Sequence, residues 1–334
     1  MSTRVAVLGA GSFGTCLAIL CGREHEVVLW ARDPALAAAI NQDRRNPRYL
    51  KDAEVPRSVE ASADLDHALD GREIVICAVP SQGVRGVMSE AGQKLAPGAI
   101  VVSTIKGIEP GSCLTMHQVL EDVIPASHRE RLVVLSGPSF AKEVAAGKPT
   151  VVTIACRHEE HAVTVRNALS NPAFRCYSNT DVLGVELGGA LKNVIALAVG
   201  ICDGLGLGHN SRAALMTRGL AEITRLGVKL GADPLTFLGL SGVGDLVLTC
   251  TGDLSRNRSV GLELGRGRPL GEILAAMAEV AEGVRTTYAA CELAERAGVE
   301  LPIAAMVREV LDGRLAPAAA VEKLMTRKLG HERP

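Results

Sequence analysis

A glycine-rich turn close to the first residue constrains the fold more than any other feature of the chain. The sequence Gly9-Ala10-Gly11-Ser12-Phe13-Gly14 follows the apolar run Val5–Leu8 and leads directly into a helical pattern. In such a strand–turn–helix unit, Gly9 permits the tight turn, Gly11 lets a pyrophosphate approach the backbone, and Gly14 lets the helix pack on the strand. The N–H groups of the helix N-terminus favour phosphate binding. The turn therefore predicts a dinucleotide site; the alternative is a turn that serves packing alone.

Short apolar runs alternate with helical patterns until about residue 180. The runs span residues 5–8, 27–30, 74–79, 100–105, 132–135, 151–154 and 174–177. Runs that are apolar throughout are typical of strands buried on both faces of a parallel sheet. After Asp181 these runs stop, and the pattern is helical. We therefore predict an α/β Rossmann-type doubly wound sheet domain over residues 1–180, which binds the dinucleotide, and an all-α helical domain over residues 181–330, which binds the substrate.

The composition excludes several classes of function. The formal net charge is -1 and only 2% of the residues are aromatic, which argues against a face that binds nucleic acid. The nine Cys are scattered without C-x-x-C pairs or zinc-like spacing to His, so we expect no metal site and free thiols in the cytoplasm. Glycines interrupt the N-terminal apolar run, and no uncharged run stays hydrophobic over about 18 residues. We therefore expect neither a signal peptide nor a membrane span.

The end of the second predicted strand bears on which dinucleotide binds. A site for NAD(H) places a carboxylate about 20 residues beyond the glycine turn, against the ribose 2′-hydroxyl. Here Arg32 and Asp33 occupy that place. The guanidinium of Arg32 can meet a 2′-phosphate, whereas Asp33, which Pro34 follows, is better suited to cap the next helix. We expect NADP(H) to be preferred and NAD(H) to be possible. The alternative is that Arg32 is a solvated surface charge.

Polar side chains follow two of the predicted strands, at the edge where sheets of this kind bind ligands. Lys106 comes directly after the run 100–105, where its cation could touch cofactor and substrate alike. Ser139 follows the run 132–135 at the start of a helix expected over residues 139–146. There Ser139 can cap the helix while the neighbouring N–H groups hold an oxygen.

The helix expected over residues 181–203 carries a lysine in an almost wholly apolar sequence. Glu186, Gly189 and the pair Lys192-Asn193 share one stripe of this helix. Burial of the ammonium would lower the pKa of Lys192 towards neutrality, which suits a group that exchanges a proton with a carbonyl or hydroxyl oxygen. The alternative is a lysine whose amine reaches water. Asp245, in a Gly-rich apolar stretch, is the carboxylate expected to pair with Lys192.

A serine, an arginine and an asparagine stand together before another helical pattern. Ser255, Arg256 and Asn257 combine a hydroxyl, a guanidinium and an amide near a helix start, which suits a phosphate dianion. The alternative is an N-cap with solvated arginines.

The order and spacing of these segments resemble one family from about residue 4 to residue 325. The segments are GAGSFGT, WARDP, CAVPSQ, STIKGIE, LSGPSFA, ELGGALKNVIALA, GVGDLVLTCTGDLSRNR and AEGVRT. Together they resemble the bacterial-type NAD(P)-dependent glycerol-3-phosphate dehydrogenases. The segments SGPSFA, LKN and DLSRNR are specific to that family, whereas the glycine turn is not.

The resemblance implies roles for individual residues. Lys192 would be the catalytic acid–base. The residues implied to bind the substrate are Lys106, Gly137, Ser139, Lys192, Asp245, Ser255, Arg256 and Asn257. The residues implied to bind the cofactor are Gly9, Gly11, Ser12, Phe13, Gly14, Arg32, Lys106, Ala141, Arg256, Val280 and Glu282. Phe13 stands in an aromatic slot that is often Trp or Tyr in the family.

The implied reaction is reversible hydride transfer that reduces dihydroxyacetone phosphate to sn-glycerol 3-phosphate. The resemblance also implies a supply of glycerol phosphate for glycerophospholipid synthesis, in a cytoplasmic homodimer. One alternative is a related dehydrogenase with a helical second domain, of the 3-hydroxy acid or 6-phosphogluconate type, which also carries a Lys-Asn pair on a long helix. Another is a non-catalytic NAD(P)-binding sensor, which would need no proton donor in the cleft.

Overall fold

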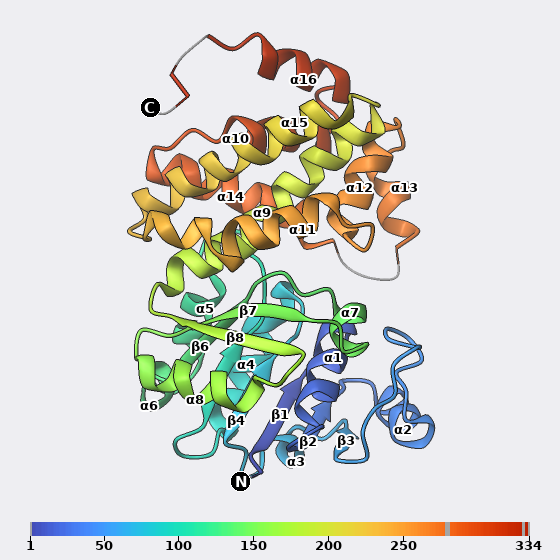
Figure 1. Ribbon diagram of the computed structural model, residues 1–334, viewed down its shortest axis with the longest axis vertical. Coiled ribbons are helices and arrows are strands. Elements are labelled where there is room, and N and C mark those ends of the chain that lie inside the picture. The colour runs from blue at the N-terminus through green and yellow to red at the C-terminus, as the bar shows by residue number, and fades with distance from the viewer. Residues whose placement is uncertain (1, 278–280, 329–330, 333–334) are drawn as a thin grey trace.

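The computed structural model of the protein describes residues 2–277, 281–328 and 331–332. Among these residues, eight strands form one sheet (Figure 1). The strands are β1 (Arg4–Leu8), β2 (Glu26–Trp30), β3 (Val59–Ser62), β4 (Ile74–Cys77), β5 (Ile100–Ser103), β6 (Leu132–Ser136), β7 (Thr150–Ala155) and β8 (Phe174–Asn179). Their order is β3-β2-β1-β4-β5-β6-β7-β8. The strand order reverses between β1 and β4, and the carboxyl ends of such a pair flank the crevice where these sheets bind ligands.

Helices cover both faces of this sheet, as a doubly wound fold requires. They are α1 (Ser12–Cys21), α2 (Pro34–Asp43), α3 (Leu65–Leu69), α4 (Val84–Ala91), α5 (Met116–Val123), α6 (Ala126–Arg129), α7 (Ala141–Ala145) and α8 (Glu159–Leu169), with the 3₁₀ turns η1 (Ser81–Gly83) and η2 (Gly92–Lys94). One core joins the sheet to α1, α2 and α8, and a second core joins the opposite face to α3, α4 and α5. Alternate residues of β1 enter the two cores: Val5 and Val7 the first, Ala6 and Leu8 the second.

Three local features differ from the sequence-based expectations. The strand β3 was not expected, because its alternation of buried Val59 and exposed Glu60 is too short to stand out. β7 runs antiparallel to β6, whereas the apolar runs had predicted a parallel sheet. The sequence also predicts a helix over residues 111–124. That helix begins only at Met116, because Thr115 caps it in a capping box with Gln118.

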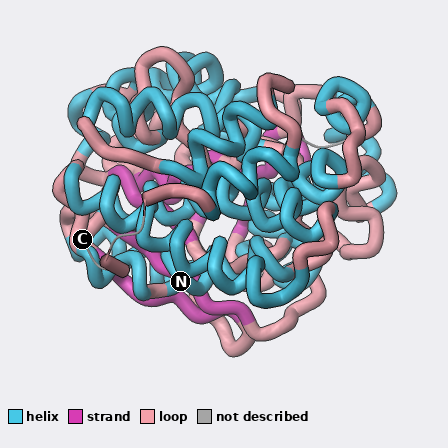
Figure 2. Tube along the Cα trace, turned by 90° about the horizontal axis from the view of Figure 1, so that it is seen from above, coloured by secondary structure: helices cyan, strands magenta, loops and turns pink. Residues whose placement is uncertain are grey.

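The second half of the chain is helical, and its longest helix lies at the centre. The elements are α9 (Val182–Gly204), α10 (Gly208–Lys229), η3 (Pro234–Leu238), η4 (Leu240–Gly244), α11 (Asp245–Thr251), α12 (Arg256–Gly265), α13 (Leu270–Ala275), α14 (Glu282–Ala297), α15 (Pro302–Leu311) and α16 (Pro317–Met325). Seen from above, these helices cover much of the sheet (Figure 2). The predicted fold class, a Rossmann-type sheet followed by an all-α domain, is confirmed.

Helix α9 is long and apolar enough to cross a membrane by length and composition alone. In this protein, however, 94% of its most apolar window is buried among the other elements. That burial is typical of the central helix of a folded domain. Asp181 starts the helix by accepting a hydrogen bond from the N–H of Gly184 at 2.9 Å. The domain boundary between residues 180 and 181 stays a prediction.

Candidate active site

The glycine turn between β1 and α1 has three different surroundings at its three glycines. Gly9 has φ +111°, and a Cβ there would lie 2.8 Å from the carbonyl oxygen of Ala78. A Cβ on Gly14 would lie 1.8 Å from the carbonyl oxygen of Gly9, so only glycine fits. A Cβ on Gly11 would meet nothing within 4 Å, and no side chain caps the first turn of α1. Gly9 and Gly14 therefore serve the turn and the packing, whereas the space beside Gly11 is open to a ligand.

A buried asparagine that the sequence reasoning missed holds this turn in place. The amide of Asn46 donates to the carbonyl oxygen of Ala10 at 2.9 Å and to Oγ1 of Thr15 at 2.8 Å. Ser12 Oγ donates to the carbonyl oxygen of Tyr49 at 3.0 Å, so the segment after α2 closes over the turn. The one signal for Asn46 was the pair Asn-Pro, which predicts a turn but not a buried amide. Phe13 is half-buried and packs on the first core.

The end of β2 separates the two side chains that bear on cofactor choice. Asp33 is the N-cap of α2, accepts from the N–H of Ala35 at 3.0 Å, and has Pro34 at the first helical position, as predicted. Its carboxylate also pairs with Arg48 at 2.6 Å. Both the N–H of Ala35 and the Arg48 guanidinium lower the pKa of Asp33. Arg32 is exposed. Arg48 is therefore a second cation near the end of β2, held there by Asp33, and the sequence reasoning did not single it out.

The ammonium of Lys192 is buried between α9 and α11. Its Nζ donates to Oδ1 of Asp245 at 2.5 Å and to Oγ1 of Thr249 at 2.6 Å. The Lys192 side chain is 7% exposed and the Asp245 side chain 1%. Burial lowers the pKa of Lys192 to about 7; the charge of Lys106 acts in the same direction, and Asp245 opposes it. The alternative of an amine in bulk water is therefore wrong, and the expected pairing with Asp245 is confirmed.

Thr249 is a further contact of Lys192 that the sequence reasoning missed. It lies one helical turn after Asp245 in α11, so the two side chains share a face of that helix. That spacing was the available signal, but it has meaning only once α11 is known to pack against α9.

Lys106 approaches the same carboxylate from the sheet. Its Nζ donates to Oδ2 of Asp245 at 2.6 Å and to the carbonyl oxygen of Gly137 at 3.1 Å. Gly189 of α9 lets that helix pack closely on the end of β6, because a Cβ there would lie 2.6 Å from Ser136 Oγ. One carboxylate thus holds two ammonium groups at the carboxyl ends of β5 and β6, and Lys106 is still 20% exposed.

The segment after β6 differs from expectation at Ser139. Helix α7 begins at Ala141 with Phe140 as its N-cap, so Ser139 does not cap it. The hydroxyl of Ser139 instead donates to the carbonyl oxygen of Gly137 at 3.0 Å, two residues back. Ser139 stands one residue before the N-cap position, and its hydroxyl is used by this local hydrogen bond. Ala141 is partly buried against the first core.

The N-terminus of α12 is joined to α9 and α14 by a chain of amide hydrogen bonds. Asn257 donates from Nδ2 to Oδ1 of Asn193 at 2.9 Å and accepts at Oδ1 from the N–H of Gly283 at 2.9 Å. Ser255 is buried and is the N-cap of α12, accepting from the N–H of Arg258 at 3.3 Å. Arg256, the first residue of α12, is exposed. The N-cap that the sequence offered as an alternative is therefore present beside the exposed guanidinium.

Glu282 links the helical domain to the crevice edge of the sheet. It is the first residue of α14. It accepts hydrogen bonds from the N–H of Ser81 at 3.1 Å and from the Ser81 hydroxyl, at the start of η1, which follows β4. Val280 lies outside the described residues. Within the described part of the chain, no group of three or more His, Cys, Asp or Glu side chains could hold a metal ion.

The open space at Gly11 and the uncapped start of α1 fit the pyrophosphate of a dinucleotide. The buried pair Lys192–Asp245 comes from the second domain and meets Lys106 at the same edge of the sheet. Fold and site together define a two-domain dinucleotide-dependent dehydrogenase.

Comparison with known proteins narrows this class. The family model "NAD-dependent glycerol-3-phosphate dehydrogenase N-terminus" matches residues 4–162, and the corresponding C-terminus model matches residues 181–322. The chain is 52% identical to the glycerol-3-phosphate dehydrogenase [NAD(P)+] of Nitratidesulfovibrio vulgaris, over 98% of this chain and all of that protein. It is 53% identical to the enzyme of the same name from Myxococcus xanthus, over 97% of each. The crystal structure of glycerol-3-phosphate dehydrogenase from Coxiella burnetii superposes with a TM-score of 0.92 at 37% identity, covering 98% of this chain and 99% of that one. The chain belongs to the NAD-dependent glycerol-3-phosphate dehydrogenase family.

Proposed function

We propose that the protein catalyses the reversible NAD(P)-dependent reduction of dihydroxyacetone phosphate to sn-glycerol 3-phosphate. The observation that carries the proposal is the buried Lys192 ammonium, held 2.5 Å from Asp245 beside Lys106. A ketone reductase must deliver a proton to the oxygen that becomes a hydroxyl, and a donor with a pKa near the working pH serves best. The product would supply glycerol phosphate for glycerophospholipid synthesis.

The residues of the glycine turn fit the cofactor. Gly9 and Gly14 shape the turn, and the N-terminus of α1 offers N–H groups to the pyrophosphate beside Gly11, Ser12 and Phe13. When bound, the cofactor supplies or accepts the hydride. The exposed Arg32 favours a 2′-phosphate, so we propose that NADP(H) is preferred over NAD(H). Ala141, Arg256 and Glu282 complete the proposed cofactor contacts; Val280 is proposed from the family resemblance alone.

Lys192 is the proposed acid–base. In the direction of reduction, its protonated amine gives a proton to the substrate oxygen; in the direction of oxidation, the neutral amine takes one back. Asp245 and Thr249 fix the amine by two hydrogen bonds, so its orientation is set before the substrate arrives. Burial of the Lys192 side chain strengthens this interaction, because a cationic donor acts most strongly where water is excluded.

The phosphate is proposed to bind at the N-terminus of α12. Arg256 offers an exposed guanidinium, and the hydroxyl of Ser255, which accepts from Arg258, keeps its hydrogen to donate. Asn257 uses Oδ1 and one N–H for Gly283 and Asn193, so its second amide hydrogen is left for an anion. Anchoring the phosphate there decides which carbon meets the hydride. Lys106, Gly137 and Ser139 are proposed to contact the triose portion.

Initial rates of NADPH and NADH oxidation test the proposal. We expect oxidation that depends strictly on dihydroxyacetone phosphate, with a higher kcat/KM for NADPH. Substrates of the 3-hydroxy acid and 6-phosphogluconate types serve as the comparison. Turnover of one of these in place of the triose phosphate would identify the related dehydrogenase class instead, and cofactor binding without turnover would identify a sensor.

We further propose two domains, over residues 1–180 and 181–330, in a cytoplasmic homodimer. All nine cysteines are buried and unbridged, which suits a reducing compartment.

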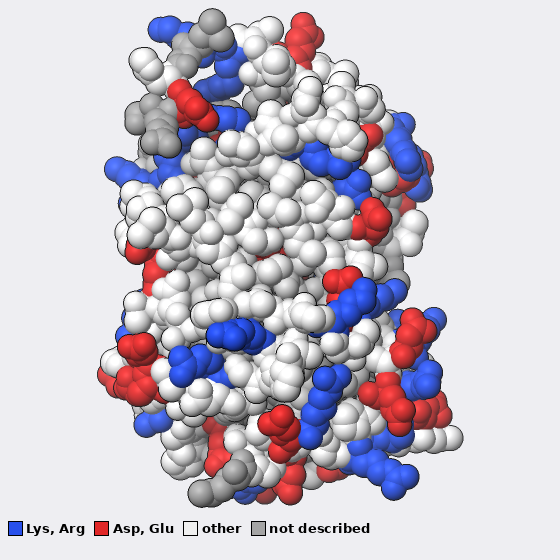
Figure 3. Space-filling view, in the orientation of Figure 1, with Lys and Arg blue, Asp and Glu red and all other residues white. Residues whose placement is uncertain are grey.

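Charged side chains are sparse on one face of the helical domain (Figure 3). Exposed apolar residues of this domain lie on α10, η3 and α11; they are Val228, Leu235, Leu238 and Val247. Light scattering of the wild type should give the mass of a dimer. The double variant Leu235→Asp with Leu238→Asp should be a monomer, whereas Met325→Asp on α16, the control, should remain a dimer. A monomeric wild type would refute the dimer.

A further inference from the structure

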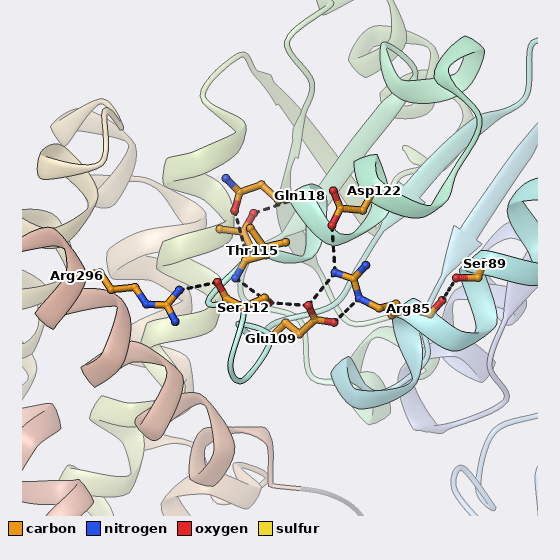
Figure 4. A network of polar contacts seen from close by, with 9 residues as sticks. Arg85, Ser89, Glu109, Ser112, Thr115, Gln118, Asp122 and Arg296 are labelled. Carbon is orange, nitrogen blue, oxygen red and sulfur yellow. Dashed lines mark hydrogen bonds and ion pairs between the residues drawn. The ribbon is translucent and has the colours of Figure 1, made fainter.

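The segment between β5 and α5, residues 104–115, carries Lys106 and is fastened to both domains. Ile108, two residues after Lys106, is 2% exposed and belongs to the core of the helical domain. Arg296 of α14 donates to the carbonyl oxygen of Ser112 at 2.9 Å (Figure 4). It also donates to the carbonyl oxygen of Gly111 at 2.8 Å. The helical domain thus binds the middle of a segment whose two ends belong to the sheet domain.

The sheet domain holds the same segment from the other side. Arg85 of α4 donates from Nε and Nη2 to the two carboxylate oxygens of Glu109 at 2.9 and 2.8 Å. This guanidinium lowers the pKa of Glu109. Glu109 also accepts from the hydroxyl of Ser112 at 2.6 Å. Figure 4 shows that Ser112 is the meeting point, because its carbonyl faces Arg296 and its hydroxyl faces Glu109.

The segment itself is an ordered hairpin rather than a loose loop. The N–H of Glu109 donates to the carbonyl oxygen of Leu114, and the N–H of Cys113 to that of Glu109, both at 2.9 Å. Cys113 has φ +61°, a conformation that a residue with a Cβ keeps only when its surroundings enforce it. The positions of residues 106–115 are therefore set by their contacts rather than by local preference.

We propose that Arg296 is a positioning residue for the reaction: with Glu109 and Arg85 it fixes residues 106–115 so that the Lys106 ammonium stays against Asp245. The inference rests on the proposed function, in which Lys106 contacts the substrate. Asp245 belongs to the helical domain and Lys106 to the sheet domain, so their 2.6 Å contact depends on how the domains are joined. The guanidinium of Arg296, which binds two carbonyl oxygens at once, fixes direction as well as distance.

The energetics separate this role from general stability. The Arg296 side chain is 50% exposed, and exposed polar pairs contribute only about 0–1 kcal/mol to folding. Geometry at a reacting centre is far less tolerant, since a misplacement of about 1 Å can cost about a hundredfold in rate. Loss of the Arg296 contacts should therefore show in catalysis before it shows in the melting temperature.

The test compares Arg296→Met, Arg296→Lys and Arg314→Met. Met keeps the apolar stem of Arg296 and removes both hydrogen bonds to the segment, together with the ion pair that Arg296 makes with Glu292 within α14. Lys can meet one carbonyl oxygen but lacks the planar fork. Arg314 is the matched control, because its side chain is 56% exposed and pairs with Glu309 and Asp312 inside the helical domain. We expect Arg296→Met to lower kcat/KM for dihydroxyacetone phosphate about tenfold. Its melting temperature should stay near that of the wild type. Arg296→Lys should be intermediate and Arg314→Met unchanged.

Amide hydrogen exchange supplies a readout that does not depend on activity. In Arg296→Met, the amides of Glu109 and Cys113 should exchange faster, while β1 and β4 keep the wild-type rates. Unchanged exchange at these two amides would overturn the tether, and faster exchange with unchanged kcat/KM would overturn the positioning role. A wild type without activity on dihydroxyacetone phosphate would instead refute the proposed function, and the exchange data would still decide whether Arg296 holds the segment.

Discussion

Lys192 Nζ lies 2.5 Å from Oδ1 of Asp245, and the carboxylate that receives it is almost fully buried. The other oxygen of that carboxylate holds Lys106 at 2.6 Å. Asp245 thus sets the position of one cation from each domain. It also counteracts the loss of charge that burial imposes on Lys192, so the lysine can exist in both protonation states near neutral pH.

Removing the Lys192 amine should abolish turnover without abolishing cofactor binding. For Lys192→Ala we expect a fall in kcat of about 10²–10⁴-fold, the usual contribution of a positioned proton donor. The dissociation constant for NADPH, measured by fluorescence titration, should change little. A variant that turns over at the wild-type rate would rule out Lys192 as the acid–base.

The pH profile should report the lowered pKa of Lys192. In the direction of reduction the protonated amine is required, so kcat/KM should be constant at acid pH and fall above about pH 7. In the direction of oxidation the neutral amine is required, so the same group should produce a rate that rises through about pH 7.

Two variants should shift this fall of kcat/KM, the alkaline limb of the pH profile for reduction, in opposite directions. Asp245→Asn removes the charge that raises the pKa of Lys192, so the limb moves to lower pH. Lys106→Met removes a charge that lowers it, so the limb moves to higher pH. Both variants should also be slower than the wild type. Shifts in the same direction would contradict the assignment of the limb to Lys192.

Glycine-to-alanine substitutions should separate binding from folding within the turn. Gly11→Ala places its methyl group in open space, so we expect an unchanged melting temperature and a KM for NADPH raised at least about tenfold. Gly14→Ala forces a clash with the carbonyl oxygen of Gly9 and should destabilise the fold itself. Equal melting temperatures for the two variants, measured by calorimetry, would count against this division.

Arg32 should govern the choice between the two cofactors. For Arg32→Ser we expect the KM for NADPH to rise about tenfold, consistent with the loss of a charge-assisted hydrogen bond, while the KM for NADH changes little. Arg57→Ser, at an exposed position before β3, is the control. If NADPH and NADH are affected equally by Arg32→Ser, the residue does not contact the 2′-phosphate.

The buried Glu186 should make stability fall as pH rises. Burial raises the pKa of Glu186 from 4.5 to about 7, although the Thr115 side chain and the N–H of His117 oppose the shift. The folded state therefore holds a proton that the unfolded state releases, and stability is lost between about pH 4.5 and pH 7. The free energy of unfolding of Glu186→Gln, taken relative to that of the wild type, should therefore rise by about 3 kcal/mol over that range.

The control for this measurement is Glu309→Gln. Arg314 lowers the pKa of the half-buried Glu309, so the contribution of this carboxylate is already complete above about pH 5. Chemical denaturation between pH 5 and pH 8 gives the free energy of unfolding of each variant relative to the wild type. This difference should stay constant for Glu309→Gln and should rise with pH for Glu186→Gln. A constant difference for both would show that Glu186 is charged throughout.

The local pattern of the chain determined the elements and several site features. Continuous apolar runs, the glycine turn and the Asp33-Pro34 cap follow from backbone sterics and burial, which act over a few neighbouring residues. The apolar surroundings of Lys192 likewise indicated a lowered pKa before any contact was known.

Only the tertiary structure decided which distant groups meet. The Lys192–Thr249 bond, the Asn46 amide under the glycine turn and the direction of β7 depend on packing between segments far apart in the chain. The same holds for Arg296. Nothing in the sequence distinguishes it from other exposed arginines, because its contacts form only when α14 packs beside residues 111 and 112. Hydrogen bonds and ion pairs act over only a few ångströms, so spacing along the sequence cannot specify them until the fold has brought their partners together.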